Sequence, residues 1–217
     1  MRILPMAQDH KRAYDGDRGP NTGGMGSYSP VPQLAKIDYQ RMVEEVVKPT
    51  VAGLASGNYN YHGILYIGLM LTNDGPKVIE YNVRLGDPET QVVLPRLASD
   101  FAEICDCAVR NQALPEVKEN KQAILGVVLC AKGYPQNPKS GFKLPGLPAD
   151  PNIFIDYANV AGQTGNLTAA GGRILMVISS QDSLPKAYQA VYNYLKGVSS
   201  DHVFYRHDIG KKALAEH

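Results

Sequence analysis

The sequence is most informative between residues 77 and 91, which read Lys77-Val-Ile-Glu-Tyr-Asn-Val-Arg-Leu-Gly-Asp-Pro-Glu-Thr-Gln91. Apolar and polar residues alternate up to Arg84, which predicts a half-buried β-strand. In such a strand Glu80, Asn82 and Arg84 share one face, about 6.6 Å apart at a rise of roughly 3.3 Å per residue. The two oxygen ligands suit Mg²⁺, and the guanidinium suits a phosphate or carboxylate. A solvent-facing edge strand would carry the same side chains, so the alternation alone leaves both interpretations open.

The residues that follow favour a binding site. The stretch Gly86-Asp-Pro-Glu89 predicts a turn into a helix, with Asp87 as the N-cap and Pro88 at the first helical position. A helix N-terminus directly after the polar strand would bring backbone N–H groups near the side chains of Glu80, Asn82 and Arg84.

A second candidate binding stretch lies near the N-terminus, where Gly19-Pro-Asn-Thr-Gly-Gly-Met-Gly26 follows Gln8-Asp-His-Lys-Arg12. Glycines allow positive φ angles and a close approach of the backbone to a ligand. Successive N–H groups there could form an anion-binding nest. The stretch is not a Walker A loop, because no Gly-Lys-Ser/Thr follows. By composition alone a flexible surface loop is the favoured interpretation.

The remaining pattern predicts an α+β fold. We expect a helix over 37–56 kinked at Pro49, an antiparallel hairpin of strands 63–71 and 77–84 turning at Asn73-Asp-Gly75, and a helix capped by Asp100. A polar segment over 111–122 indicates a boundary between domains 1–115 and 120–217. The second domain is expected to contain strands 123–131, 153–160, 173–179 and 202–209 and a helix beginning at Pro185.

Composition indicates an ordinary globular protein. The 217 residues are 44% hydrophobic and 20% charged, with a formal net charge of +1. This charge gives no argument for a nucleic-acid partner or an anionic membrane, and no apolar run reaches the 18 residues of a transmembrane helix. The three cysteines lack zinc-ligand spacing and are expected to be reduced thiols of a cytoplasmic protein.

The string Arg84-Leu-Gly-Asp-Pro-Glu-Thr-Gln91, together with Gly19–Gly26 and Gln8–Arg12, resembles the glycinamide ribonucleotide synthetase family of the ATP-grasp superfamily. The resemblance implies the C-terminal part of an ATP-grasp domain, an antiparallel sheet with helices, followed by a small α+β C-terminal domain. It also implies an ADP-forming carbon–nitrogen ligase of de novo purine biosynthesis. Such an enzyme joins glycine to 5-phosphoribosylamine through a glycyl phosphate, with ATP as co-substrate.

The resemblance also implies residue roles. Glu80 and Asn82 correspond to ligands of Mg²⁺ or Mn²⁺, Arg84 to the contact with the transferred phosphate, and Asp87 to a second catalytic residue. Residues that would position phosphates or substrate are Lys11, Pro20, Asn21, Thr22, Gly23 and Gly24.

The resemblance covers only the C-terminal half of the family's usual architecture. The Rossmann-like N-terminal domain and the subdomain that closes over ATP have no counterpart here. We therefore expect an incomplete fragment that is inactive alone, with the missing N-terminal half or a second copy as its partner. The alternatives are another ATP-grasp carboxylate–amine ligase and a non-catalytic module that binds nucleotide or a partner.

Overall fold

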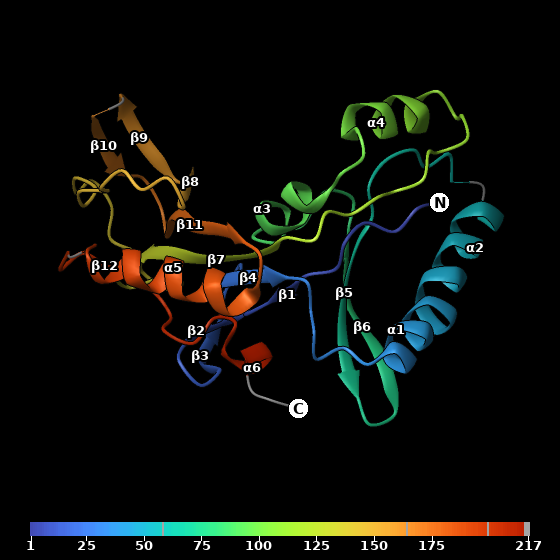
Figure 1. Cartoon of the computed structure of the whole chain (residues 1–217), viewed down its shortest axis with the longest axis horizontal. Helices are drawn as coiled ribbons and strands as arrows, with labels where there is room; N and C mark the ends of the chain where they lie inside the picture. The colour runs from blue at the N-terminus through green and yellow to red at the C-terminus, as the bar shows by residue number, and fades with distance from the viewer. Residues whose placement is uncertain (58, 164, 199, 215–217) are drawn as a thin grey trace. The chain divides into compact units, whose positions relative to one another are not determined.

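A computed structural model describes residues 1–57, 59–163, 165–198 and 200–214 (Figure 1). The chain forms two compact units that interleave along the sequence. Unit 1 comprises Met1–Leu4, Pro32–Gly86 and Leu97–Glu119. Unit 2 comprises Pro5–Val31, Asp87–Arg96 and the residues from Asn120 onward. Residues 5–31 and 87–96, which we expected in the first domain, therefore pack with the C-terminal part of the chain.

Unit 2 is built on a six-stranded antiparallel sheet in the order β1-β4-β7-β11-β8, with β12 also pairing with β7. Its strands are β1 (Gln8–Asp9), β4 (Gly26–Ser29), β7 (Ala123–Ala131), β8 (Phe154–Tyr157), β11 (Arg173–Gln181) and β12 (Val203–Phe204). Helix α5 (Leu184–Lys196) packs on β7 and β11 (Figure 1). The short elements are β2 (Arg12–Tyr14), β3 (Arg18–Asn21), α3 (Thr90–Val93), η2 (Leu94–Arg96), β9 (Val160–Gln163), β10 (Asn166–Ala169) and α6 (Lys211–Leu214).

The interleaving follows from the hydrogen-bonding needs of β7. All nine residues of this apolar strand are buried, and buried backbone groups need partners. Strand β11 satisfies one edge and β4 satisfies part of the other, with Gly26 opposite Val127. Met25, directly before β4, and Tyr28, within it, are fully buried. The N-terminal motif segment is therefore part of the core of unit 2, although its composition resembles that of a surface loop.

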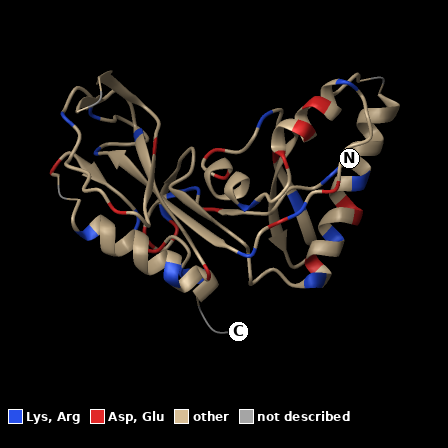
Figure 2. Ribbon diagram, turned by 45° about the horizontal axis from the view of Figure 1, so that its top comes forward, with Lys and Arg blue, Asp and Glu red and all other residues tan. Residues whose placement is uncertain are grey.

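Unit 1 contains a long helical segment and a two-stranded hairpin. The segment runs through α1 (Lys36–Met42), a π-helical turn η1 (Val43–Val47) and α2 (Lys48–Ser56). The irregularity lies just before Pro49, which has no N–H to donate to the preceding turn. Acidic and basic residues are spread along this segment (Figure 2). Of its apolar side chains, Val46 is buried, Met42 and Leu54 are half-buried, and Val51 is 37% exposed.

The hairpin consists of β5 (Tyr66–Thr72) and β6 (Gly75–Asn82), and its turn is where the sequence predicts it. The expectation that Arg84 belongs to this strand is wrong, because β6 ends at Asn82 and the chain bends at 83–84. The remaining helix of unit 1 is α4 (Phe101–Val109), where the Asp100 side chain accepts hydrogen bonds from two backbone N–H groups, as predicted.

The expected helix start at Asp87 is also wrong. Helix α3 begins at Thr90 with Glu89 as its N-cap, and Asp87 and Pro88 form a turn before it. The physical reason is that the Asp87 carboxylate binds an arginine instead of helix N–H groups. In the C-terminal part the predicted strands at 123–131 and 173–179 are confirmed, whereas 202–209 contains only the two-residue β12. Within the described ranges, no helix combines the length and apolarity that crossing a membrane requires.

Candidate functional site

Three sequence motifs meet in unit 2 at Gly24. This residue has a φ of +115°, and a Cβ atom there would lie 2.3 Å from Pro88 Cδ and 2.9 Å from Asp9 Oδ1. Ser27, just beyond the glycine stretch, donates a hydrogen bond from its hydroxyl to the Pro88 carbonyl at 2.8 Å. The Gln8–Arg12 segment, the glycine stretch and the Asp87–Glu89 turn therefore pack directly against one another, and only glycine fits at their meeting point.

An arginine from β11 joins two of these motifs. Arg173 contacts the Asp87 carboxylate with both terminal nitrogens, Nη2 to Oδ2 at 2.7 Å and Nη1 to Oδ1 at 3.1 Å. The same Nη1 donates to the Gly23 carbonyl at 2.9 Å. The Gly171-Gly172 pair before this arginine is typical of a structural turn, and the sequence alone assigns no role to Arg173. The signal was present as a lone guanidinium beside two glycines, but nothing local pointed to its partner 86 residues earlier.

The backbone N–H groups of the glycine stretch are already used within the protein. Those of Thr22 and Met25 donate to the carbonyls of Lys11 and His10, at 2.8 and 2.9 Å. Gly23 N–H donates to the Tyr134 hydroxyl at 2.9 Å, and Gly24 N–H donates to the Thr22 hydroxyl at 3.0 Å. The expected anion-binding nest is therefore not formed. The stretch is instead a fixed connection between the Gln8–Arg12 segment and the Asp87 turn.

A buried acidic group lies beside the one lysine of these motifs. Lys11 Nζ is 2.7 Å from Asp9 Oδ2, and the Asp9 side chain is 8% exposed. Burial is the largest cause that raises the pKa of Asp9, followed by repulsion from the buried Glu89, while Lys11 opposes both. The resulting pKa is about 6. The pKa of Asp9 therefore lies well above that of an ordinary carboxyl group, and its contact with Lys11 holds the ammonium at a defined place.

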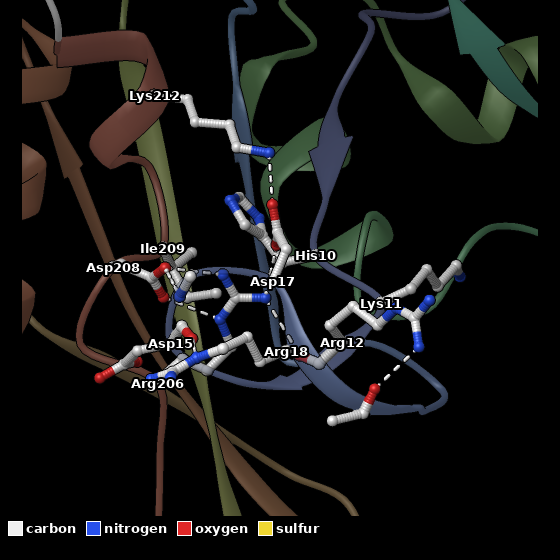
Figure 3. Close-up of polar contacts among 12 residues, drawn as sticks. His10, Lys11, Arg12, Asp15, Asp17, Arg18, Arg206, Asp208, Ile209 and Lys212 are labelled. Carbon is white, nitrogen blue, oxygen red and sulfur yellow. Dashed lines mark hydrogen bonds and ion pairs between the residues drawn. The ribbon is translucent and has the colours of Figure 1, made fainter.

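The turn between β2 and β3 is fixed by the C-terminal segment (Figure 3). The guanidinium of Arg206 is 1% exposed and makes a two-point contact with Asp208, with both distances 2.8 Å. It also lies 2.9 Å from Asp17 Oδ1 and donates to the Arg12 carbonyl at 3.0 Å. Lys212 pairs with the other oxygen of Asp17. The hairpin that begins after Lys11 is therefore attached to residues almost 200 positions later.

His10 lies next to this ion cluster and carries no charge at neutral pH. It is 4% exposed, and neither ring nitrogen has a hydrogen-bond partner among the described residues. Burial, and after it the positive charge of Arg206, lowers the pKa of His10 to about 4. His10 therefore acts as a neutral core side chain, packed against the Tyr28 ring at a centroid distance of 5.8 Å.

Unit 1 holds the predicted metal ligands. Glu80 and Asn82 alternate along β6, where they pair with Gly68 and Tyr66 of β5. Arg84, beyond the strand end, donates from Nη2 to Asn82 Oδ1 at 3.2 Å and from Nη1 to the Leu85 carbonyl at 2.7 Å. A carboxylate and an amide oxygen on one strand face fit a divalent cation that takes its other ligands from phosphates and water. Across the described residues, no group of three or more His, Cys, Asp or Glu side chains is placed to hold a metal ion.

The structure thus divides the predicted site residues between the two units. Unit 2 contains Lys11, Pro20, Asn21, Thr22, Gly23, Gly24 and Asp87. Unit 1 contains Glu80, Asn82 and Arg84.

Comparisons with known proteins agree with the motifs. Residues 1–90 match a family model described as phosphoribosylglycinamide synthetase, ATP-grasp (A) domain, and residues 124–212 match the C domain of the same synthetase. A phosphoribosylamine–glycine ligase of Halalkalibacterium halodurans is 48% identical over 99% of this chain and 50% of its own length. The crystal structure of a phosphoribosylamine–glycine ligase from Thermotoga maritima is similar, with a TM-score of 0.83 and 38% identity over 96% of this chain and 52% of that one.

A biotin carboxylase from Campylobacter jejuni shares the fold, with a TM-score of 0.62 and 19% identity over 83% of this chain and 40% of that one. These likenesses define an α+β protein of the ATP-grasp class. Within that class, the chain belongs to the phosphoribosylglycinamide synthetase family. It spans about half the length of the relatives it matches.

Proposed function

We propose that this chain carries part of the active site of a phosphoribosylamine–glycine ligase. The reaction would join glycine to 5-phosphoribosylamine and convert ATP to ADP and phosphate. The observation that carries the proposal is the packing of Asp9 and Pro88 against Gly24 in unit 2. Lys11 pairs with Asp9, and Asp87, next to Pro88, is joined to Gly23 through Arg173. Residues from three separate motifs must lie this close together to take part in one reaction. A loop with only a structural role would not require it.

Unit 2 would supply positioning and charge. The Lys11 ammonium is a point charge suited to a phosphate or carboxylate oxygen, and Asp9 holds it in place. The Asp87 side chain is 51% exposed while one side is bound to Arg173, which leaves it accessible to an amine or hydroxyl of a substrate. Pro20, Asn21, Thr22, Gly23 and Gly24 would set the position of these groups through the backbone.

Unit 1 would supply the metal ligands. Glu80 and Asn82 would hold Mg²⁺, with Mn²⁺ as a substitute, together with oxygens of ATP. When bound, such a cation neutralises phosphate charge. Arg84 would add a guanidinium for the transferred phosphate, since it lies two residues after Asn82. Its present hydrogen bond to Asn82 Oδ1 would have to be released when that oxygen binds the cation.

The activity would also require a partner. Several large apolar side chains of the β5–β6 hairpin, and Val83 directly after it, are at least 40% exposed. Those of the hairpin are Met70, Leu71, Val78, Ile79 and Tyr81. Exposed apolar surface of this kind marks an interaction site. Since the relatives are twice as long, we propose that the partner is the N-terminal half of such a ligase in the cytoplasm. Self-association through the hairpin is the competing arrangement.

The test is ADP release in the presence of glycine, 5-phosphoribosylamine, ATP and Mg²⁺. The chain is measured alone and mixed with the N-terminal half of the Halalkalibacterium relative. We expect release only in the mixture, and only when both acceptor substrates are present. Glu80→Gln should lower the rate by at least 100-fold, because it removes the charged metal ligand. Glu103→Gln, at an exposed glutamate of the same unit, is the matched control and should change the rate less than twofold.

The outcomes separate the alternatives. ADP release driven by a different carboxylic acid would indicate another ATP-grasp ligase. Nucleotide binding without ADP release would indicate the non-catalytic module. Full activity of the chain alone would contradict the proposed need for a partner.

A further inference from the structure

Arg173 lies outside the three motifs that meet at Gly24, yet it binds two of them. We propose that Arg173 is a positioning residue of the ligase reaction, which holds Asp87 and the Gly23 backbone in one fixed arrangement. This inference rests on the function proposed above, since it assigns a role within that reaction.

Gly23 is held on both sides of its backbone by two side chains of unit 2, those of Arg173 and Tyr134. Its carbonyl accepts from Arg173 Nη1 at 2.9 Å, and its N–H donates to the Tyr134 hydroxyl at 2.9 Å. Tyr134 in turn packs on Gly172, where a Cβ atom would lie 2.1 Å from the tyrosine ring. The glycine before Arg173 therefore lets the tyrosine reach the loop, and the two side chains together fix one peptide unit.

Arg173 itself belongs to the central sheet of unit 2, which is a rigid part of the fold. It is the first residue of β11, where it pairs with Cys130 of the fully buried strand β7. Its side chain is 20% exposed, and that of Asp87 is 51% exposed. A half-exposed ion pair contributes little to stability. The planar fork nevertheless fixes the direction of the Asp87 carboxylate, so the pair is better suited to orientation than to folding.

The positioning extends to Lys11, one of the residues predicted to position phosphates or substrate. Thr22 donates to the Lys11 carbonyl from its N–H and from its hydroxyl, both at 2.8 Å. Fixing Gly23 therefore fixes the neighbouring Thr22 and, through it, the backbone of Lys11. A lysine at position 173 has one compact ammonium and cannot make two parallel bonds to Asp87 while also reaching the Gly23 carbonyl.

The first experiment tests whether Arg173 fixes the Gly23 backbone, and it does not require a measurement of activity. Amide hydrogen exchange of the 217-residue chain is followed by NMR for the wild type, Arg173→Lys and Arg110→Lys. Arg110 forms an exposed arginine–aspartate pair with Asp106 and is the matched control. We expect the Gly23 and Gly24 amides to exchange roughly 10- to 100-fold faster in Arg173→Lys, the range that loss of charged hydrogen bonds gives. Amides of Val127 and Val177 in the core should not change. Unchanged Gly23 exchange would overturn the proposal.

The second experiment measures the reaction in the mixture with the N-terminal half. Arg173→Lys should lower kcat roughly 10- to 100-fold and leave KM for ATP within twofold, while Arg110→Lys should match the wild type. Arg173→Ala should regain activity when methylguanidinium is added, which a purely structural defect would not do. A change in KM without a change in kcat, or the absence of rescue by methylguanidinium, would contradict a positioning role. If the wild-type mixture releases no ADP, the proposed function fails, and the exchange measurement still decides whether Arg173 holds the loop.

Discussion

Gly24 is the residue at which the motifs of unit 2 are in closest contact. Substitution Gly24→Ala would place a methyl group against Pro88 and Asp9 and force a non-glycine residue to a φ of +115°. We expect it to lower the free energy of unfolding by about 2–4 kcal/mol, from overpacking together with backbone strain. Urea unfolding followed by circular dichroism measures the loss.

Gly141→Ala is the control that separates crowding from strain. Gly141 also has a positive φ, +79°, but no atom lies within 4 Å of its Cβ position. We expect a loss of about 1 kcal/mol there. Equal losses at the two positions would show that the contact with Pro88 and Asp9 is not tight.

Asp9 and His10 are adjacent residues whose pKa values shift in opposite directions. The raised pKa of Asp9, about 6 against 3.8, means that the folded protein binds this proton more tightly than the unfolded chain. Its contribution to stability is therefore lost as the pH rises through that range. The lowered pKa of His10, about 4 against 6.5, has the reverse effect, so its contribution grows as the pH rises. Each amounts to about 3 kcal/mol.

We predict that these two contributions nearly cancel between pH 4 and pH 6. The free energy of unfolding of the wild type should change little across this range. In Asp9→Asn the histidine acts alone, so the free energy of unfolding should rise by about 3 kcal/mol from pH 4 to pH 6.5. Urea titrations at half-unit pH intervals test this. A flat profile for the variant would contradict the burial of a neutral His10.

At the scale of elements, helix α4 offers a test of local stability. The Asp100 carboxylate accepts from the N–H groups of Ala102 and Glu103, at 2.8 and 3.2 Å. Asp100→Ala should destabilise the first turn by about 1 kcal/mol, so these two amides should exchange roughly fivefold faster. Ser183→Ala at the start of α5 is the comparison, because Ser183 makes no side-chain cap. An equal effect at Ser183 would show that the cap bond adds nothing.

Elements defined by local pattern were predicted well. The hairpin around Asn73-Asp-Gly75, strands β7 and β11 and the α4 cap all follow from periodicity and turn chemistry over a few residues. The pairing of β4 with β7 could not be predicted this way, since its partners are about 100 residues apart and β4 is only four residues long. Large sequence separation is also the reason why the sequence did not reveal the pairing of Arg173 with Asp87 or that of the buried Arg206 with Asp17. The motif residues were selected because their types carry chemistry, and their roles in the reaction stay predictions.

At the scale of the whole molecule, the apolar core is unevenly divided. Among the described residues, Val46, Pro76 and Ile104 are the buried apolar side chains of unit 1, while unit 2 contains an extensive buried core along β7, β11 and α5. Stability scales with the apolar area removed from water. Unit 1 therefore lacks the internal packing that would hold its hairpin and helices together by themselves, and a two-stranded hairpin is at best marginally stable alone.

This asymmetry predicts that the two units open independently in the 217-residue chain. Amides of β5 and β6 should exchange at least 100-fold faster than those of β7 and β11, because unit 1 can open without disrupting the core of unit 2. Addition of the N-terminal half should slow exchange in β5 and β6 and leave β7 unchanged, since binding stabilises only the unit it covers. Ile79→Ser, on the exposed face of β6, should weaken this protection, whereas Phe154→Ser, at an exposed aromatic of unit 2, should not. Uniform exchange across both units would mean that unit 1 is stabilised without a partner, and the proposed docking of the N-terminal half would then lose its physical basis.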